Sequence, residues 1–291
     1  MPLPVSKSQI RKLGQRLLAK SVSSDDELLL QDLLYGFDEV KTAVRSAIVA
    51  MELPSRYELG VTARTKTRDT LIEKISRLNG SGRALASVQD IAGVRVVAKA
   101  TLDEQDEIAR AIAAESFWDV EPTLVDRRSV PVQGYRAVHL VGSTAGGWNV
   151  EIQVRTTVQD AWANMYEALG DAFGRGIRYP DYDDISVVSP DVRALVSMCM
   201  SLSLDKIVLL EDAENVAAAI RASLRSAISR KLNVKAQLSS ESGFLDSGLS
   251  VRGLIRDKLH PMDREVRVKK RSMIDACNDL ADDLTLSSLS Q

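Results

Sequence analysis

One segment, residues 148–156, restricts the fold more than any other part of the sequence. It reads WNVEIQVRT, and its apolar and polar residues alternate without a break. Alternation with a period of two is typical of a β-strand that is buried on one face only. The strand therefore turns Glu151, Gln153 and Arg155 to the face opposite its apolar side chains. A carboxylate, an amide and a guanidinium on one face form either a solvated edge or the wall of a site.

The neighbouring segments extend this strand into a mixed sheet. A second β-like run, YRAVHLVG at 135–142, precedes it, and the tight turn at 144–147 makes the two strands antiparallel. Further strand patterns alternate with single helices, which predicts an α+β fold with a mixed β-sheet. These strands are expected at 61–66, 92–99 and 118–126, and the helices at 67–79, 104–115 and 157–172.

The chain divides into three regions by pattern. With 291 residues, of which 45% are hydrophobic, it can bury a sizeable core. Helical spacing of apolar residues predicts an N-terminal helical region at 1–53, and a C-terminal helical region at 185–291 that is interrupted by a Ser/Gly-rich stretch at 239–250. The sheet-forming core lies between them, at 54–184.

Composition excludes several classes of protein. The net charge of -2 gives no global preference for nucleic acid or membrane, so any such surface must be local. Cys199 and Cys277 lack the spacing of a disulfide framework or a zinc site. The N-terminus lacks a signal-peptide pattern, and the apolar stretch 194–210 is too short and too polar to span a bilayer. We therefore expect a cytoplasmic protein without a membrane partner.

Two more side chains are expected beside Glu151. If 135–142 is a regular strand, Tyr135 and His139 lie on one face, next to Glu151 across the hairpin. A ring and an imidazole there could stack a base and contact phosphates, although a lone tyrosine and histidine in a strand are more often packing residues. The chain has only 2 histidines, which excludes a mechanism that needs several imidazoles.

A cluster of cations is expected near residue 70. Arg64 and Lys66 share one face if 61–66 is extended, and Lys74 follows on the next helix. Clustered cations beside a helix start bind phosphates, so a triphosphate is a natural ligand. A solvated basic helix start is the alternative interpretation.

A second carboxylate, Asp90, stands immediately before the strand expected at 92–99. Together with Glu151 on a neighbouring strand, it could supply oxygen ligands for Mg²⁺ that bridges phosphates. Its alternative role is that of a cap at the start of the strand.

Taken together, these segments resemble the synthetase domain of RelA/SpoT proteins. The resemblance covers about residues 56–180 and rests on motifs that occur in the family's order and spacing. Each motif alone is weak, but their combination is specific. They are RTKTRDTLIEK at 64–74, DIAGVR at 90–95, GYRAVH at 134–139 and EIQVRT at 151–156.

The resemblance implies a nucleotidyltransferase-like core and an ATP-dependent diphosphokinase, a transferase that uses Mg²⁺. It implies that Arg64 and Arg95 sandwich adenine, a stacking role that lysine could not replace. Phosphates would be gripped by Lys66 and Lys74, and the metal would be held by Asp90 and Glu151. Glu151 is also the implied base for the acceptor 3'-hydroxyl. The implied acceptor-side residues are Tyr135, which would stack on the base, and His139, Gln153 and Arg155.

The sequence departs from the family in places. Thr70 replaces a serine, which keeps the hydroxyl. More telling is VPVQGY at 130–135, where many members carry KPNGY, so the acceptor side is expected to differ. His260 is followed by proline and does not fit the His-Asp dyad of the family's hydrolase domain. We therefore expect a stand-alone synthetase without the reverse activity.

Several functions remain open from the sequence. The first is transfer of the β,γ-diphosphate of ATP to GDP or GTP, which makes (p)ppGpp, an alarmone of the stringent response. The second is a toxic synthetase, paired with an antitoxin, that modifies adenosine nucleotides or the 3' end of tRNA; the basic residues of 225–235 and 264–271 could contact tRNA. The third, from another class, is a non-catalytic nucleotide sensor. The sequence does not choose an oligomeric state.

Overall fold

The computed structural model describes residues 2–78, 85–178, 189–238 and 260–289. By their contacts, the residues form two compact units. The first unit comprises 1–100, 104–130 and 136–156, and the second comprises 101–103, 131–135 and 157–291.

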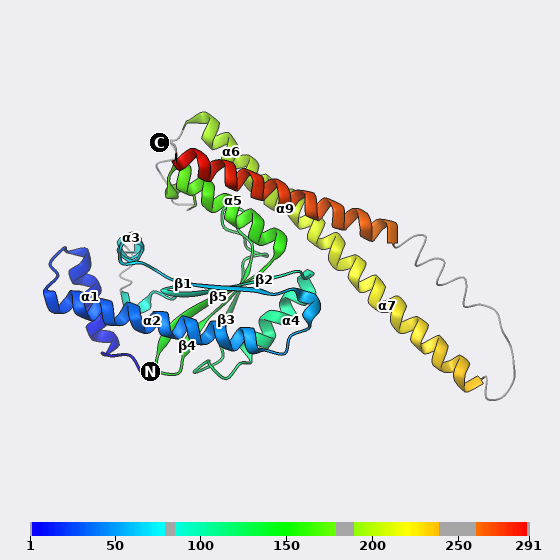
Figure 1. The fold of residues 1–291 in the computed structure, drawn as a ribbon, viewed down its shortest axis with the longest axis horizontal. Helices are drawn as coiled ribbons and strands as arrows, with labels where there is room; N and C mark the ends of the chain where they lie inside the picture. Colours follow the sequence, from blue (N-terminus) through cyan, green and yellow to red (C-terminus); the bar gives the residue numbers. More distant parts are fainter. Residues whose placement is uncertain (1, 79–84, 179–188, 239–259, 290–291) are drawn as a thin grey trace. The chain divides into compact units, whose positions relative to one another are not determined.

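The first unit is built on a five-stranded sheet in the order β1-β2-β5-β4-β3 (Figure 1). β2 and β5 are parallel, whereas the other neighbouring pairs are antiparallel. The sheet is therefore mixed, which confirms the predicted α+β class and the antiparallel hairpin. The strands are β1 (Gly60–Thr65), β2 (Ala92–Ala98), β3 (Thr123–Asp126), β4 (Val138–Thr144) and β5 (Trp148–Thr156).

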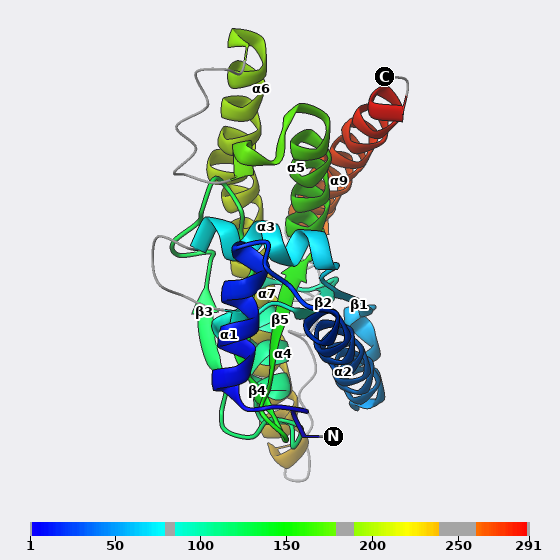
Figure 2. The same ribbon diagram turned by 90° about the vertical axis from the view of Figure 1, so that its left-hand side faces the viewer.

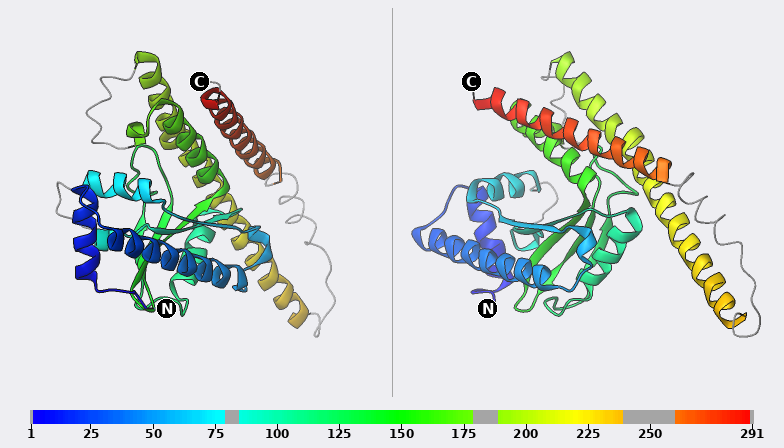
Figure 3. Two further views of the ribbon diagram at one scale, coloured as in Figure 1. Left: turned by 60° about the vertical axis from the view of Figure 1, so that its left-hand side comes forward. Right: turned by 45° about the vertical axis from the view of Figure 1, so that its right-hand side comes forward.

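Helices cover the apolar face of this sheet. α1 and α2 begin at capping boxes built on Ser6 and Ser23, in which the serine side chain and a side chain of the first turn each bind a free backbone amide. α2 runs beside the strands in the views of Figure 3 and contacts β1 and β2. The helices of this unit are α1 (Lys7–Leu18), α2 (Ser24–Ala50), η1 (Ser55–Tyr57), α3 (Arg68–Leu78), η3 (Leu85–Ser87) and α4 (Leu102–Ala113).

α2 packs on one face of the sheet, so the opposite face is available for a functional site. Trp148 is fully buried and meets Phe37 edge-to-face, with ring centroids 4.8 Å apart. Gly36 lets the helix approach, because a Cβ at this position would clash with the Trp148 ring. The residues of β2 and β5 that point the other way are only half-buried, apart from Arg155 near the end of β5. The polar face of β5 is thus not part of the core.

The second unit is helical. α6 continues through a π-helical segment, η6, into α7, while α5 and α9 lie side by side (Figures 2 and 3). Its core includes Trp162 and Tyr166, which stack at 4.8 Å, and both buried cysteines. The helices are α5 (Thr157–Phe173), η4 (Arg175–Arg178), α6 (Pro190–Ser201), η6 (Leu202–Ile207), α7 (Val208–Leu238) and α9 (His260–Leu289).

These units group the residues differently from the three predicted regions. The N-terminal helices share one hydrophobic core with the sheet, and α5 groups with the C-terminal helices. The predicted break at 239–250 and the segment 180–184 lie outside the described residues. Among the described helices, none is long and apolar enough to cross a membrane.

A tight turn at 132–135 belongs to the second unit. The Tyr135 amide donates to the carbonyl oxygen of Val132 at 2.9 Å. Both central residues have positive φ, 51° at Gln133 and 80° at Gly134, as in a type I′ turn. Glycine adopts this conformation freely, whereas glutamine is strained in it. The departure of this segment from the family pattern therefore places a strained residue two positions before Tyr135.

Replacing Gln133 with asparagine should relieve this strain. Asparagine tolerates the left-handed region and is favoured before glycine in type I′ turns, so Gln133→Asn should raise the free energy of unfolding by about 0.5–1 kcal/mol. Thermal or urea denaturation of the full chain measures this. Val130→Asn, which lies outside the turn, serves as the control and should give no such gain. A destabilised Gln133→Asn variant would contradict the strain.

Candidate functional site

The strand register gathers the predicted nucleotide-binding residues on one face of the sheet. Arg64 of β1 pairs with Gly93 of β2, which pairs with Glu151 of β5. One row along, Arg95 of β2 pairs with Gln153 of β5. Gln153 in turn pairs with His139 of β4. Alternation sends all of these side chains to the same side of the sheet. The predicted sharing of a face by Glu151 and Gln153 is confirmed, and residues from β1, β2 and β4 join them.

Gly93 leaves an open floor between Arg64 and Glu151. A Cβ built at Gly93 meets nothing closer than the Arg64 carbonyl oxygen, at 3.7 Å. Because that is ordinary contact, the fold itself does not demand glycine here. A larger side chain would instead occupy the space between the guanidinium and the carboxylate, which is where a ligand would lie.

Asp90 joins the two predicted phosphate-binding lysines. It lies just before β2, as expected, and its Oδ2 is 2.8 Å from Lys74 Nζ and 3.2 Å from Lys66 Nζ. The Lys66 amide donates to the carbonyl oxygen of Ile91, which ties the end of β1 to the start of β2. Lys74 is held on α3, whose first turn is capped by the Thr67 hydroxyl. The lysines and Asp90 therefore form a single charged cluster.

Glu151 is the most tightly held acid of the site. His139 Nδ1 lies 3.0 Å from its Oε1, and Gln153 Nε2 donates to its Oε2 at 2.9 Å. Burial opposes ionisation, but the hydrogen bond and charge of His139, the hydrogen bond from Gln153 and the charge of Lys74 together lower the pKa of Glu151 to about 2. Glu151 is therefore ionised at neutral pH. The influence of Lys74 also links this cluster electrostatically to the one around Asp90.

The two carboxylates fit a divalent cation that is shared with phosphates. Asp90 Oδ1 is buried and has no hydrogen-bond partner, so one carboxylate oxygen is left to accept a ligand. In the described part of the chain, no group of three or more Asp, Glu, His or Cys could enclose a metal. Mg²⁺ commonly binds through one or two carboxylates and takes its other ligands from water and phosphate. Asp90 and Glu151 match that pattern.

Arg155 differs from the predicted role of an acceptor-contacting residue. It is only 1% exposed, and its Nη2 donates to Gln153 Oε1 at 2.7 Å. This bond orients the Gln153 amide so that its nitrogen points to Glu151. Arg155 therefore acts on the site through Gln153.

The expected place of Tyr135 is wrong. β4 begins at Val138, so Tyr135 does not continue the strand face that carries His139. The positive φ angles at Gln133 and Gly134 break the alternation, and Tyr135 packs among the apolar side chains of the second unit. The predicted pairing of its ring with Glu151 across the hairpin was based on a strand that is shorter than expected.

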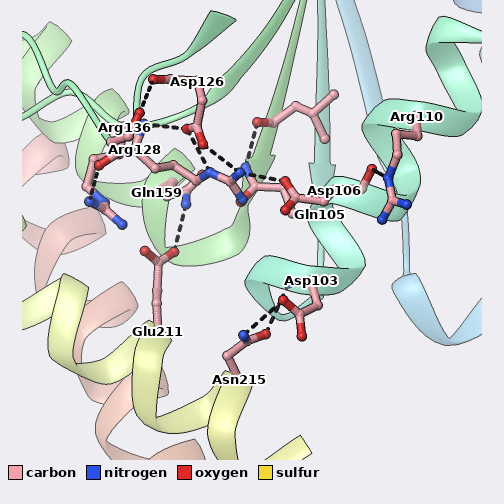
Figure 4. Close-up of polar contacts among 12 residues, drawn as sticks. Asp103, Gln105, Asp106, Arg110, Asp126, Arg128, Arg136, Gln159, Glu211 and Asn215 are labelled. Atoms are coloured by element: carbon pink, nitrogen blue, oxygen red, sulfur yellow. Dashed lines mark hydrogen bonds and ion pairs between the residues drawn. The ribbon is translucent and has the colours of Figure 1, made fainter. Parts of the chain in front are cut away.

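A partly buried arginine that the motifs do not reveal anchors the segment before this turn; 11% of its side chain is exposed. Arg128 donates to both carboxylate oxygens of Asp126 and to Asp106, and its carbonyl oxygen accepts from Arg136 (Figure 4). Its Nη1 also reaches Gln105, whose amide binds the β5 backbone. Burial opposes the charge of Arg128, but the carboxylates outweigh it and raise its pKa. Such a network fixes the residues that follow β3.

The proposed tRNA-binding cations are less available than the sequence indicates. Lys270 is buried, and its Nζ lies 2.5 Å from Glu214. Lys269 pairs with Glu265 at 2.7 Å. The charges at these positions of α9 are therefore balanced within the chain rather than presented as a continuous basic surface.

The comparison with protein families identifies the region that carries this site. Residues 63–169 match the model described as the region found in RelA/SpoT proteins. This match spans Arg64 through Arg155 and confirms the resemblance. The chain thus carries a RelA/SpoT-type region, the class that its motifs predicted.

Individual relatives are similar to parts of the chain. An uncharacterized protein of Mycobacterium tuberculosis is 44% identical over 154 residues, which is 52% of this chain and 55% of the relative. The GTP pyrophosphokinase YjbM of Bacillus subtilis is 32% identical over 120 residues, or 38% of this chain and 54% of the relative. The chain spans about half the length of the curated relatives it matches. Among solved structures, small alarmone synthetase 1 from Bacillus subtilis aligns with a TM-score of 0.47 and 21% identity, covering 70% of this chain and 100% of that one.

Proposed function

We propose that the chain is an ATP-dependent diphosphokinase that transfers the β,γ-diphosphate of ATP to the ribose 3'-hydroxyl of GDP or GTP. The observation that carries the proposal is a pair of carboxylates among cations: Glu151 on the polar face of the sheet, and Asp90 just before β2 beside Lys66 and Lys74. A pure binder of polyphosphate gains nothing from two anions beside its ligand unless a metal is present. The RelA/SpoT region over the same residues and the GTP pyrophosphokinase named among the relatives support the choice of acceptor.

The cations account for binding of the donor. Arg64 and Arg95 reach from neighbouring strands, and their planar guanidinium groups suit stacking on adenine. Lys66 and Lys74 are held together by Asp90 and supply point charges for the phosphates. When bound, Mg²⁺ supplies charge neutralisation between phosphate groups, and Asp90 and Glu151 would hold it.

The transfer itself requires little covalent chemistry from the protein. The acceptor 3'-oxygen attacks the β-phosphorus, the bond from this phosphorus to the oxygen bridging the α- and β-phosphates breaks, and AMP leaves with that oxygen. Negative charge on the phosphoryl oxygens is stabilised by Lys66 and Lys74, and positioning provides the rest of the acceleration. The proton of the hydroxyl passes to Glu151.

The low pKa of Glu151 sets the order of these events. A carboxylate with a pKa of about 2 is a weak base and cannot deprotonate a free ribose hydroxyl to a useful extent. The hydroxyl becomes strongly acidic only once its oxygen has begun to bond to phosphorus. Glu151 therefore accepts the proton only after the bond to phosphorus has begun to form. Until then its role is that of a charged carboxylate.

Purified full-length chain with Mg²⁺ and β,γ-labelled ATP tests the proposal against a panel of acceptors. GDP, GTP, AMP, ADP and deacylated tRNA are supplied separately, and products are resolved by chromatography and gel. Label on GDP or GTP is the expected result. Label on adenosine nucleotides or tRNA alone would contradict the guanosine acceptor and favour the toxic synthetase. An antitoxin partner would then be sought. Label on no acceptor would favour the nucleotide sensor.

Removal of His139 should make the reaction sensitive to acid. His139 is the strongest of the groups that lower the pKa of Glu151, whereas burial raises it. Without His139, fewer groups offset the effect of burial, so His139→Ala should raise the pKa of Glu151. The group loses activity when it is protonated, so the acidic limb of the rate profile should move to higher pH. The measurement is kcat between pH 5 and 8 for both proteins.

The control for this prediction is His260→Ala, which removes the chain's other histidine. Its profile should match that of the parent. An unchanged acidic limb in His139→Ala would mean that His139 does not keep Glu151 ionised.

A further inference from the structure

We propose that α7 is an interaction surface for a second copy of this chain, and that two α7 helices pair antiparallel along one apolar stripe. The inference goes beyond the proposed function, because it concerns self-association and uses residues of the second unit alone. It also gives a role to charged residues of α7 that diphosphate transfer does not use.

The first step is the exposed face of α7. Three large apolar side chains lie on it, since Leu209, Val216 and Ile220 are 66%, 58% and 43% exposed. Small residues occupy the neighbouring positions of the same face, and all of them are exposed: Ala213, Ala219, Ser223, Ser226 and Ala227. Together with Asp212 and Arg230, these residues form the α7 stripe. Its members recur seven positions apart, which is the spacing of a coiled-coil seam.

The second step is that the α7 stripe points away from the core of its own unit. On the opposite side of the helix, Glu211 is buried and accepts a hydrogen bond from Gln159 of α5. Glu214, also on that side, pairs with Lys270 of α9. α7 continues beyond the first described turn of α9 (Figures 1 and 3). Because a helix in water is stabilised mainly by packing of an apolar face, the stripe offers α7 a second such face.

The third step is the charge at the two ends of the stripe. Asp212 and Arg230 are both exposed and lie 18 residues apart. At about 3.6 residues per turn this is five turns, so the two side chains lie on one line along the helix. An antiparallel second copy places Asp212 of each chain against Arg230 of the other, whereas parallel pairing would oppose like charges. The charges therefore fit a second copy of this chain in the antiparallel orientation.

The same register brings small side chains together at the middle of the stripe. The two-fold axis lies midway between Asp212 and Arg230, so Ala219 of one copy faces Ser223 of the other, and Val216 faces Ser226. Small residues at the contact let two helices approach closely. At about 1.5 Å per residue the stripe is only roughly 27 Å long, so we expect a weak dimer that depends on protein concentration.

Sedimentation equilibrium of the full chain over roughly 1–200 μM tests this arrangement. The parent chain should change from monomer to dimer within this range. Arg230→Glu sets a carboxylate against Asp212 and should raise the Kd of the dimer at least about tenfold, and Asp212→Lys should do the same beside Arg230. An equimolar mixture of the two variants should dimerise as the parent does, because each contact again joins opposite charges.

Arg225→Glu is the matched control. It makes the same charge reversal at an exposed position of the same helix, on the side opposite the α7 stripe. The dimer of this variant should have the Kd of the parent dimer. Circular dichroism checks that every variant keeps the helical content of the parent chain.

Two results would overturn the inference. One is a parent chain that stays monomeric over the whole concentration range. The other is self-association of Arg230→Glu with the parent's Kd, because the copies would then meet through another surface. Neither measurement uses ATP or an acceptor, so failure here leaves the proposed function to be decided by the transfer assay alone.

Discussion

Glu151→Gln should reduce diphosphate transfer by about 10³-fold or more while leaving ATP binding nearly intact. The substitution preserves shape but removes the charge that faces His139 and the influence of Lys74. It therefore removes both a proposed metal ligand and the final proton acceptor. Single-turnover transfer and equilibrium binding of α,β-methylene-ATP measure the two effects separately.

The control for this variant is Glu58→Gln, which neutralises an exposed carboxylate of the same unit that pairs with Lys99. It should transfer at the rate of the parent chain. Full activity in Glu151→Gln would show that the charge at this position is not needed, and both roles assigned to Glu151 would have to be given up.

Asp90→Asn should lower the transfer rate by about 10²-fold and raise the Mg²⁺ concentration needed for half-maximal rate at least tenfold. An amide offers one neutral oxygen in place of the carboxylate whose Oδ1 is buried without a hydrogen-bond partner. It also leaves Lys66 and Lys74 without the anion that holds them together. Initial rates across a Mg²⁺ titration at saturating ATP give both quantities.

Asp69→Asn is the matched control for Asp90. Asp69 lies on α3, the helix that carries Lys74, but its side chain is 92% exposed, so its replacement should change neither the rate nor the Mg²⁺ dependence. If Asp90→Asn lowered the rate without altering the Mg²⁺ requirement, Asp90 would serve to orient the lysines rather than to hold the metal.

The sheet and the places of Glu151 and Asp90 in it could be predicted from local pattern. Alternation in 148–156 identified β5 and its polar face, and the tight turn at 144–147 fixed the antiparallel hairpin. Asp90 was expected just before a strand and lies there. These features depend on side-chain periodicity over a few residues, which the sequence displays directly.

The surroundings of Tyr135 could not be predicted in the same way. Tyr135 was assigned to a strand because 135–142 alternates, but the turn at Gln133 and Gly134 delays the strand until Val138. The bond that holds this turn, from Ser203 Oγ to the carbonyl oxygen of Gly134, joins residues 69 positions apart, and the Arg128 network also depends on tertiary structure. No periodic pattern encodes such contacts. Charge counts likewise cannot reveal that Lys270 is buried against Glu214.

The most direct test of the central claim is a mass-balance measurement on the full chain with ATP, GDP and Mg²⁺. Mass spectrometry follows the acceptor while AMP is quantified in the same samples, with Glu151→Gln in parallel. The expected result is that GDP gains a diphosphate in a single step, that one AMP appears for each product molecule, and that the variant yields neither. Transfer of a single phosphate with release of ADP, or AMP formation without a modified acceptor, would contradict it.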